Sequence, residues 1–189
     1  MDVNDLKSLN AEVKKRMASA IDHLRHELAG VRTGRASTGI LDPVHVEAYG
    51  TRMPLNQVAS LSVPEPTMIV AQPFDPTLMG AIEKAVRASD LGLNPNNDGK
   101  VIRIPVPPLT EDRRKELSRH VHKMAEEARN AIRTVRRDAN ERLKKLAKEK
   151  KVSEDDEKRG LDDVQKITDQ EIKQVDELQA KKDAELLTR

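Results

Sequence analysis

The chain has 189 residues, of which 35% are charged, 1% are aromatic and none is cysteine. The scarcity of aromatic rings excludes a stacking platform for single-stranded nucleic acid, and the lack of cysteine excludes disulfides, cysteine zinc sites and thiol nucleophiles. No apolar run approaches the ~20 residues of a membrane span, and the first residues do not form a signal peptide. We therefore expect a cytoplasmic protein that has no membrane partner.

The formal net charge of +2 hides a gradient along the chain. Residues 113–151 carry fifteen Lys and Arg against six Asp and Glu, whereas residues 152–189 carry seven against twelve. A basic segment of this kind favours a polyanionic partner. A solvated helix whose basic side chains pair with the acidic last segment would have the same composition, and charge alone does not decide between the two.

The first segment is predicted to be one amphipathic helix of about 28 residues. Its apolar residues recur at steps of three and four, which places them on one face. They are Leu6, Leu9, Val13, Met17, Ala20, Leu24 and Leu28. Gly30 is a plausible end of this helix.

The next segment, residues 31–104, has a different pattern. Seven of the ten prolines lie within it, and the other three follow at once. Alternating or short apolar runs predict strands at 44–48, 59–63, 67–71 and 101–104, and Pro76 opens a helix. The order β-β-β-α-β predicts a small β/α/β domain.

Two further helical stripes follow, one beginning near Leu109 and one beginning after Ser153, which is suited to cap its helix. Gly160 weakens the last helix near its start by roughly 1 kcal/mol relative to alanine. Three amphipathic helices must bury their stripes together. We predict an α+β protein in which an elongated three-helix bundle, residues 1–30 and 105–189, is interrupted by the domain at 31–104. An extended coiled-coil dimer is the alternative.

Two strands of chain would join these domains, near residues 31–35 and 104–108. They contain a glycine, which allows unusual dihedral angles, and three prolines, which stiffen the chain. The predicted hinge residues are Arg32, Thr33, Gly34, Arg35, Pro105, Val106, Pro107 and Pro108. A rigid join that merely needs turn residues would use the same residue types.

Several motifs resemble those of the ribosome recycling factor family. They are RTGRAS at 32–37, SDLGLNP at 89–95, PPLTEDRR at 107–114, IRTVRRDAN at 132–140 and DVQKITD at 163–169. They span nearly the whole chain, in order. Two positions depart from the family pattern: Thr134 stands where an asparagine is usual, and Ala48 stands where many members have an aromatic residue.

The resemblance implies an L-shaped, monomeric protein that is not an enzyme and has no cofactor. It implies binding to the post-termination ribosome, chiefly to large-subunit rRNA. With elongation factor G and GTP, the factor would separate the subunits and release mRNA and tRNA. The partner, elongation factor G, would be the protein that hydrolyses GTP. The segment 33–39 of this chain lacks the Gly-Lys-Ser/Thr ending of a phosphate-binding loop.

The basic helix carries the candidate RNA-binding residues. At 100° per residue, Arg129, Arg133, Arg136 and Arg137 gather on a face beside the apolar stripe, and we call these four residues the arginine face. Guanidinium groups suit phosphates of folded RNA. The resemblance identifies Arg136 as the main contact. Pairing of these arginines with Asp138, Glu141 or acids of the last helix is the alternative interpretation.

Parts of the sequence are also compatible with two other functional classes, a metal-dependent enzyme and a coiled-coil adaptor. His23 and His26 are one helical turn apart, which suits a pair of metal ligands, but no third ligand has a suggestive spacing. We therefore predict neither a metal site nor catalytic residues. A generic coiled-coil adaptor would explain the three helices, but not the inserted domain with its paired linkers.

Overall fold

The computed structural model describes residues 1 and 3–187 and divides the chain into two compact units. Among the described residues, the first joins the chain up to Thr33 with residues 111–187, and the second comprises Gly34–Thr110. The first unit is built from long helices and the second contains the sheets. This arrangement confirms the predicted α+β class, a helical bundle with a small sheet domain inserted into it.

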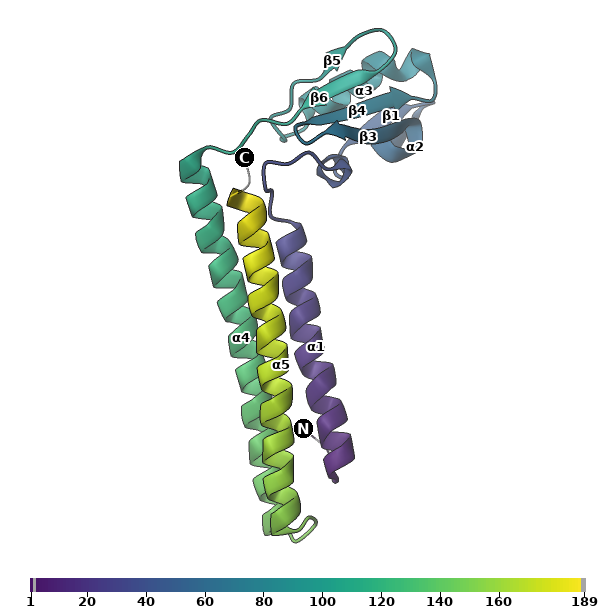
Figure 1. Cartoon of the computed structure of the whole chain (residues 1–189). Helices are drawn as coiled ribbons and strands as arrows, with labels where there is room; N and C mark the ends of the chain where they lie inside the picture. The colour runs from purple at the N-terminus through teal and green to yellow at the C-terminus, as the bar shows by residue number, and fades with distance from the viewer. Residues whose placement is uncertain (2, 188–189) are drawn as a thin grey trace. The chain divides into compact units, whose positions relative to one another are not determined.

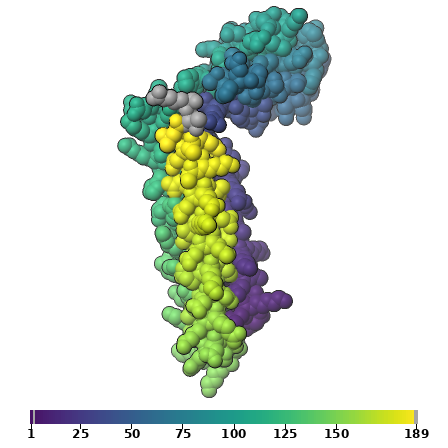
Figure 2. Space-filling model, in the orientation of Figure 1, coloured from purple at the N-terminus to yellow at the C-terminus, as the bar shows by residue number. Residues whose placement is uncertain are grey.

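Three helices form the first unit: α1 (Leu6–Ala29), α4 (Glu111–Lys148) and α5 (Glu154–Leu187). They lie side by side (Figure 1), and in the view of Figure 2 α5 covers the face between α4 and α1. Each helix buries its apolar stripe against the other two, so the bundle forms within one chain. None of the described helices is long and apolar enough to cross a membrane.

Local capping fixes where two of these helices begin. Asp5 precedes α1 and accepts the backbone N–H of Ser8 at 2.8 Å. Ser153 precedes α5, and its hydroxyl oxygen accepts the backbone N–H of Asp156 at 3.0 Å, which confirms its predicted role. Both contacts satisfy amide groups that a helix start leaves without a partner.

Gly160 lies where three helices meet. A Cβ atom added there would approach Leu143 of α4 to 2.8 Å and Leu6 of α1 to 2.9 Å. The glycine that weakens α5 locally therefore lets α5 come close to both neighbours. Packing explains a residue that helix propensity alone disfavours.

The second unit contains ten short elements. In chain order they are η1 (Thr38–Leu41), β1 (His45–Ala48), β2 (Thr51–Pro54), α2 (Leu55–Val58), β3 (Ala59–Glu65), β4 (Met68–Pro73), η2 (Pro76–Leu78), α3 (Met79–Ala88), β5 (Asn96–Asn97) and β6 (Ile102–Pro105). Strands β1 and β2 form a hairpin, and the other strands form a sheet in the order β3-β4-β6-β5. All the strand pairs are antiparallel.

The four predicted strands and the helix are present, but the predicted order was incomplete. It missed β2, α2 and β5. Strand β2 shows no alternation of buried and exposed residues, and β5 has only two residues. The hairpin turn at Tyr49 and Gly50 uses positive φ angles of 52° and 76°, so the chain reverses within two residues and β2 begins at once.

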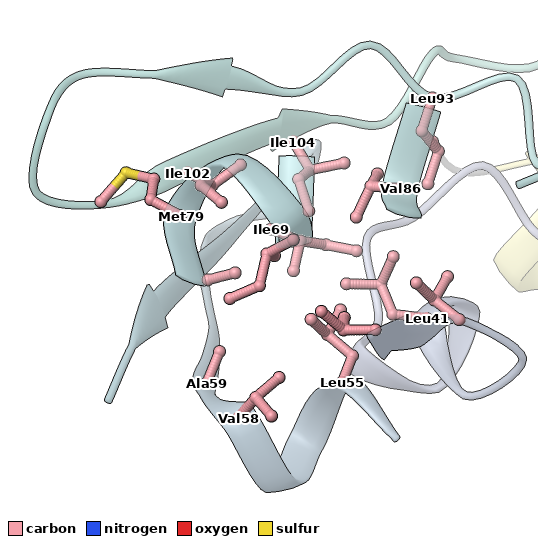
Figure 3. Packing of buried hydrophobic residues seen from close by; sticks show 14 of the residues in the cluster. Leu41, Leu55, Val58, Ala59, Ile69, Met79, Val86, Leu93, Ile102 and Ile104 are labelled. Atoms are coloured by element: carbon pink, nitrogen blue, oxygen red, sulfur yellow. The ribbon is translucent and has the colours of Figure 1, made fainter. Parts of the chain in front are cut away.

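A separate hydrophobic core stabilises this unit (Figure 3). Ile69 of β4 and Ile102 and Ile104 of β6 are completely buried, and they pack with Ile82 and Val86 of α3. The helix thus covers one face of the sheet. Two units with separate cores match the two kinds of periodicity in the sequence.

Candidate nucleic-acid interface

The arginine face occupies little more than two turns of α4. Along the chain, its residues alternate with residues of the same helix that are buried in the bundle core. Ala128, Ile132 and Ala139 of the same helix are buried. The four arginines project from the flanks of that buried stripe, and their surroundings differ sharply.

Arg129 is tied to α5. Its side chain is only 13% exposed, and its Nε and Nη2 donate to Oδ1 of Asp176 at 3.0 and 2.7 Å. Nη2 also donates to Gln179 at 2.6 Å, and Nη1 donates to Glu126 at 2.9 Å. Burial opposes the charged form, but these bonds outweigh it and raise the pKa of Arg129. Arg129 therefore links α4 to α5 through Nε and Nη2, while its Nη1 is bonded to Glu126 of α4 itself.

Glu126 connects Arg129 to the next arginine of the face. Its Oε1 accepts Nη1 of Arg133 at 3.0 Å while its Oε2 accepts Arg129. The bond from Arg133, then that from Arg129, lowers the pKa of Glu126 below its usual value. Arg133 also donates through Nη1 to Asn130 at 3.2 Å, and its side chain is 42% exposed. The Nε and Nη2 of Arg133 make no hydrogen bond within the described residues.

Arg137 is held by a hydroxyl group. Its Nη2 donates to Oγ1 of Thr134 at 3.2 Å, and that hydroxyl donates to the backbone oxygen of Asn130 at 2.9 Å. The residue that departs from the family pattern thus orients an arginine. Arg137 remains exposed.

Arg136 is half-buried, and no hydrogen bond or ion pair is found for it within residues 3–187. It does not count among the buried polar atoms that lack a partner, so its guanidinium group reaches solvent. Asp138, an acid considered as a partner for this face, instead lies 3.7 Å from Arg16 of α1. Pairing with the last helix is therefore observed for Arg129 but not for Arg136.

The boundaries of the two units fall after Thr33 and after Thr110. The predicted hinge residues 32–35 flank the first boundary, whereas residues 105–108 lie inside the second unit, before the other boundary. Gly34 has φ +77°, and a Cβ there would lie 3.0 Å from Cγ of Leu109. Val106 is buried in the second unit, and its N–H donates to the backbone oxygen of Thr67 at 2.8 Å. Arg32, Arg35, Pro107 and Pro108 are exposed, whereas Thr33 and Pro105 are half-buried.

Sequence reasoning left pairing with the last helix open but named none of the hydrogen-bond partners of Arg129, which are the acids Glu126 and Asp176 and the neutral Gln179. Only the Glu126–Arg129 spacing of three could have been read from the sequence. The partners on α5 depend on the register of two helices. No cluster of three or more possible metal ligands occurs among the described residues, and His23 lies 3.5 Å from Glu27.

The two aromatic residues of the chain were also missed as surface features. Tyr49 is 72% and Phe74 is 67% exposed. The Tyr49 hydroxyl donates to Asp75 at 2.6 Å; this bond raises the pKa of Tyr49 and, as the largest cause, lowers that of Asp75. Ala48, the second departure from the family pattern, is buried beside this turn.

Comparison with known proteins gives consistent results along the chain. The family model described as ribosome recycling factor matches residues 24–187. The ribosome-recycling factor of Symbiobacterium thermophilum is 53% identical over 181 residues, covering 96% of this chain and 98% of that protein. The one from Bradyrhizobium diazoefficiens is 54% identical over 177 residues, covering 94% of each.

Solved structures agree with the sequence comparison. A solution structure of a ribosome recycling factor is 43% identical, with a TM-score of 0.72 over 96% of this chain and 97% of that one. A second is the T. thermophilus ribosome recycling factor, described with E. coli elongation factor G on the E. coli post-termination complex. It is 50% identical, with a TM-score of 0.63 over 97% of this chain and all of that one.

Proposed function

Because the chain belongs to the ribosome recycling factor family, we propose that it binds the post-termination ribosome and helps to take it apart. With elongation factor G and GTP, it promotes dissociation into subunits and the release of mRNA and tRNA. The related structure described on a post-termination complex with elongation factor G supports this choice of partners.

The arginine face makes the contact with large-subunit rRNA. The main support for this proposal is that Arg136 has no hydrogen-bond or ion-pair partner in the described part of the chain. Arg133 and Arg137 each keep guanidinium nitrogens free beside it. A stiff helix fixes the spacing of these groups, which suits folded RNA whose phosphates also have fixed spacing. Arg129 contributes by holding α4 against α5.

The linkers provide the mechanical part of the mechanism. Val106 is anchored in the second unit, so bending falls on Pro107–Thr110 and, in the other strand, around Arg32–Gly34. The bundle holds rRNA while the partner GTPase moves the small domain. The protein itself acts as a cytoplasmic, monomeric factor without catalytic residues, and elongation factor G hydrolyses the GTP.

The RNA contact is tested with Arg136→Ala. Loss of charge-assisted hydrogen bonds to phosphate should weaken ribosome binding about tenfold or more. Alanine favours helices, so α4 should persist. Binding is measured by co-sedimentation with ribosomes at several salt concentrations, and the helical signal by circular dichroism.

Arg87→Ala is the matched control, because Arg87 is an exposed arginine of α3 in the second unit. It should leave binding nearly unchanged. Release of counterions should make wild-type binding fall steeply with salt, and Arg136→Ala should flatten that slope. Equal affinities for Arg136→Ala and the wild type, with the helical signal intact, would remove Arg136 from the interface.

A further inference from the structure

We propose that Glu126 makes the arginine face selective, favouring folded ribosomal RNA over unstructured RNA. This inference rests on the proposed function and assigns a role to an acidic residue inside a basic surface. Glu126 is a specificity-determining residue that acts through Arg133 and through its own charge.

Both carboxylate oxygens of Glu126 are engaged. Oε1 accepts a hydrogen bond from Nη1 of Arg133 at 3.0 Å, and Oε2 accepts one from Nη1 of Arg129 at 2.9 Å. Arg129 is itself fixed to Asp176 of α5. Glu126 is therefore held in place, and rotating it away from the surface would break two charge-assisted hydrogen bonds.

The carboxylate nevertheless stays near solvent, since the Glu126 side chain is 43% exposed. It occupies Nη1 of Arg133 and leaves that residue's Nε and Nη2 as the donors for a phosphate. A phosphate can accept hydrogen bonds from the free edge of the guanidinium group, but it is repelled where it comes close to the carboxylate of Glu126. The face thus contains an attractive and a repulsive element side by side.

These two elements act differently on two kinds of RNA. Folded RNA presents phosphates at fixed positions, so a matching surface can contact the free edge of Arg133 without placing a phosphate beside Glu126. An unstructured strand binds through the summed attraction of many basic residues and distributes its phosphates over all of them. Such a strand meets the negative charge of Glu126, and its binding is weakened.

Glu127 offers a matched control on the same helix. It is exposed, and no hydrogen bond or ion pair is found for it in the described part of the chain. Glu127→Gln removes the same charge one residue away, without releasing any arginine. Comparing Glu126→Gln with Glu127→Gln therefore separates the local effect from the change in net charge.

The experiment measures two affinities for each variant at one salt concentration: for large ribosomal subunits by co-sedimentation, and for fluorescent polyuridylate by anisotropy. Glu126→Gln should bind polyuridylate about threefold or more tightly than the wild type, as expected for loss of an exposed charge interaction. Its affinity for subunits should not rise in proportion, so the ratio of the two affinities falls. Glu127→Gln should leave that ratio close to the wild-type value.

A merely structural role for Glu126 would weaken subunit binding without tightening polyuridylate binding, and that result would overturn the inference. An unchanged ratio, or one that changes equally in Glu127→Gln, would overturn it as well. A wild type without any preference for subunits over polyuridylate would also overturn it. If the wild type did not bind large subunits at all, the proposed function would fail. The outcomes of the two proposals are therefore distinct.

Discussion

Arg129 and Arg136 lie two turns apart on one helix, carry the same charge and have opposite surroundings. Arg129 donates from all three nitrogens to Glu126, Asp176 and Gln179, whereas no partner is found for Arg136 in the described residues. Charge counting treats them alike. Their contacts show that Arg129 holds α4 against α5, and they leave Arg136 available for the RNA contact that we propose.

Glu171 of α5 provides a test of the bundle by pH. Burial raises the pKa of its carboxyl group above the usual 4.5, and Arg25 offsets this only in part. The folded state thus binds the proton more tightly than the unfolded state, so the charged form lowers stability at neutral pH, and this cost fades as the pH falls through the raised pKa.

Glu171→Gln should therefore be more stable than the wild type at about pH 7, and the gain should vanish near pH 4. Urea unfolding followed by circular dichroism at the two pH values measures the difference. Glu177→Gln, at an exposed acid on the same helix, is the control and should show no comparable gain. A gain that is equal at both pH values would contradict this account of Glu171.

At the scale of the elements, the close approach at Gly160 sets how α5 packs on α4 and α1. A Cβ atom would already lie 2.8 Å from Leu143, which is completely buried, and 2.9 Å from Leu6. A larger side chain must push both neighbours aside. Gly160→Leu should lower the free energy of unfolding of the bundle by about 2 kcal/mol, in the range for overpacked cores.

Gly80→Leu is the companion variant. Gly80 is exposed in α3, and nothing lies within 4 Å of the position that its Cβ would take. Leucine there should be neutral or slightly stabilising, because it favours the helix. If urea unfolding showed the two leucine variants to be equally stable, Gly160 would have no special packing role.

The sequence predicted the long helices well because each carries a stripe that repeats over many turns. It predicted β4 and β6 because each carries buried apolar residues at every second position, Ile69 and Ala71 in β4 and Ile102 and Ile104 in β6. It missed β2, whose side chains do not alternate, and β5, which is too short to show a pattern. Hydrophobic periodicity identifies an element only where one face is buried over several residues.

The candidate site was predictable in part, because only the features that lie within one helix can be read from the sequence. Helical geometry places the four arginines together without knowledge of any other element. Asp176 and Gln179 are 47 and 50 residues from Arg129, so their contact depends on how α4 and α5 align. That alignment is set by packing, which one helix alone does not reveal. Gly34 was predicted as a permissive residue, and its positive φ agrees.

At the scale of the whole molecule, the linkers should matter for splitting more than for binding. Inserting glycine and serine between Pro107 and Pro108, which are both exposed, lengthens one strand without touching either core. The variant should bind ribosomes with nearly wild-type affinity, because the arginine face is intact. Subunit separation should slow, because the push on the small domain is no longer transmitted.

Gly34→Pro is a poorer test of the same idea. Proline fixes φ near −65°, whereas Gly34 has φ +77°, so the substitution would distort the chain beside Leu109 rather than stiffen it. Normal splitting rates in the insertion variant would remove the linkers from the mechanism.

We propose that this chain couples RNA binding to subunit separation driven by elongation factor G. The most direct measurement mixes the chain with post-termination ribosomes, elongation factor G and GTP, and follows subunit dissociation by light scattering. We expect scattering to fall only when the chain, elongation factor G and GTP are all present, and to fall more slowly with Arg136→Ala. Scattering that stays constant while the chain is bound to the ribosome would contradict the account.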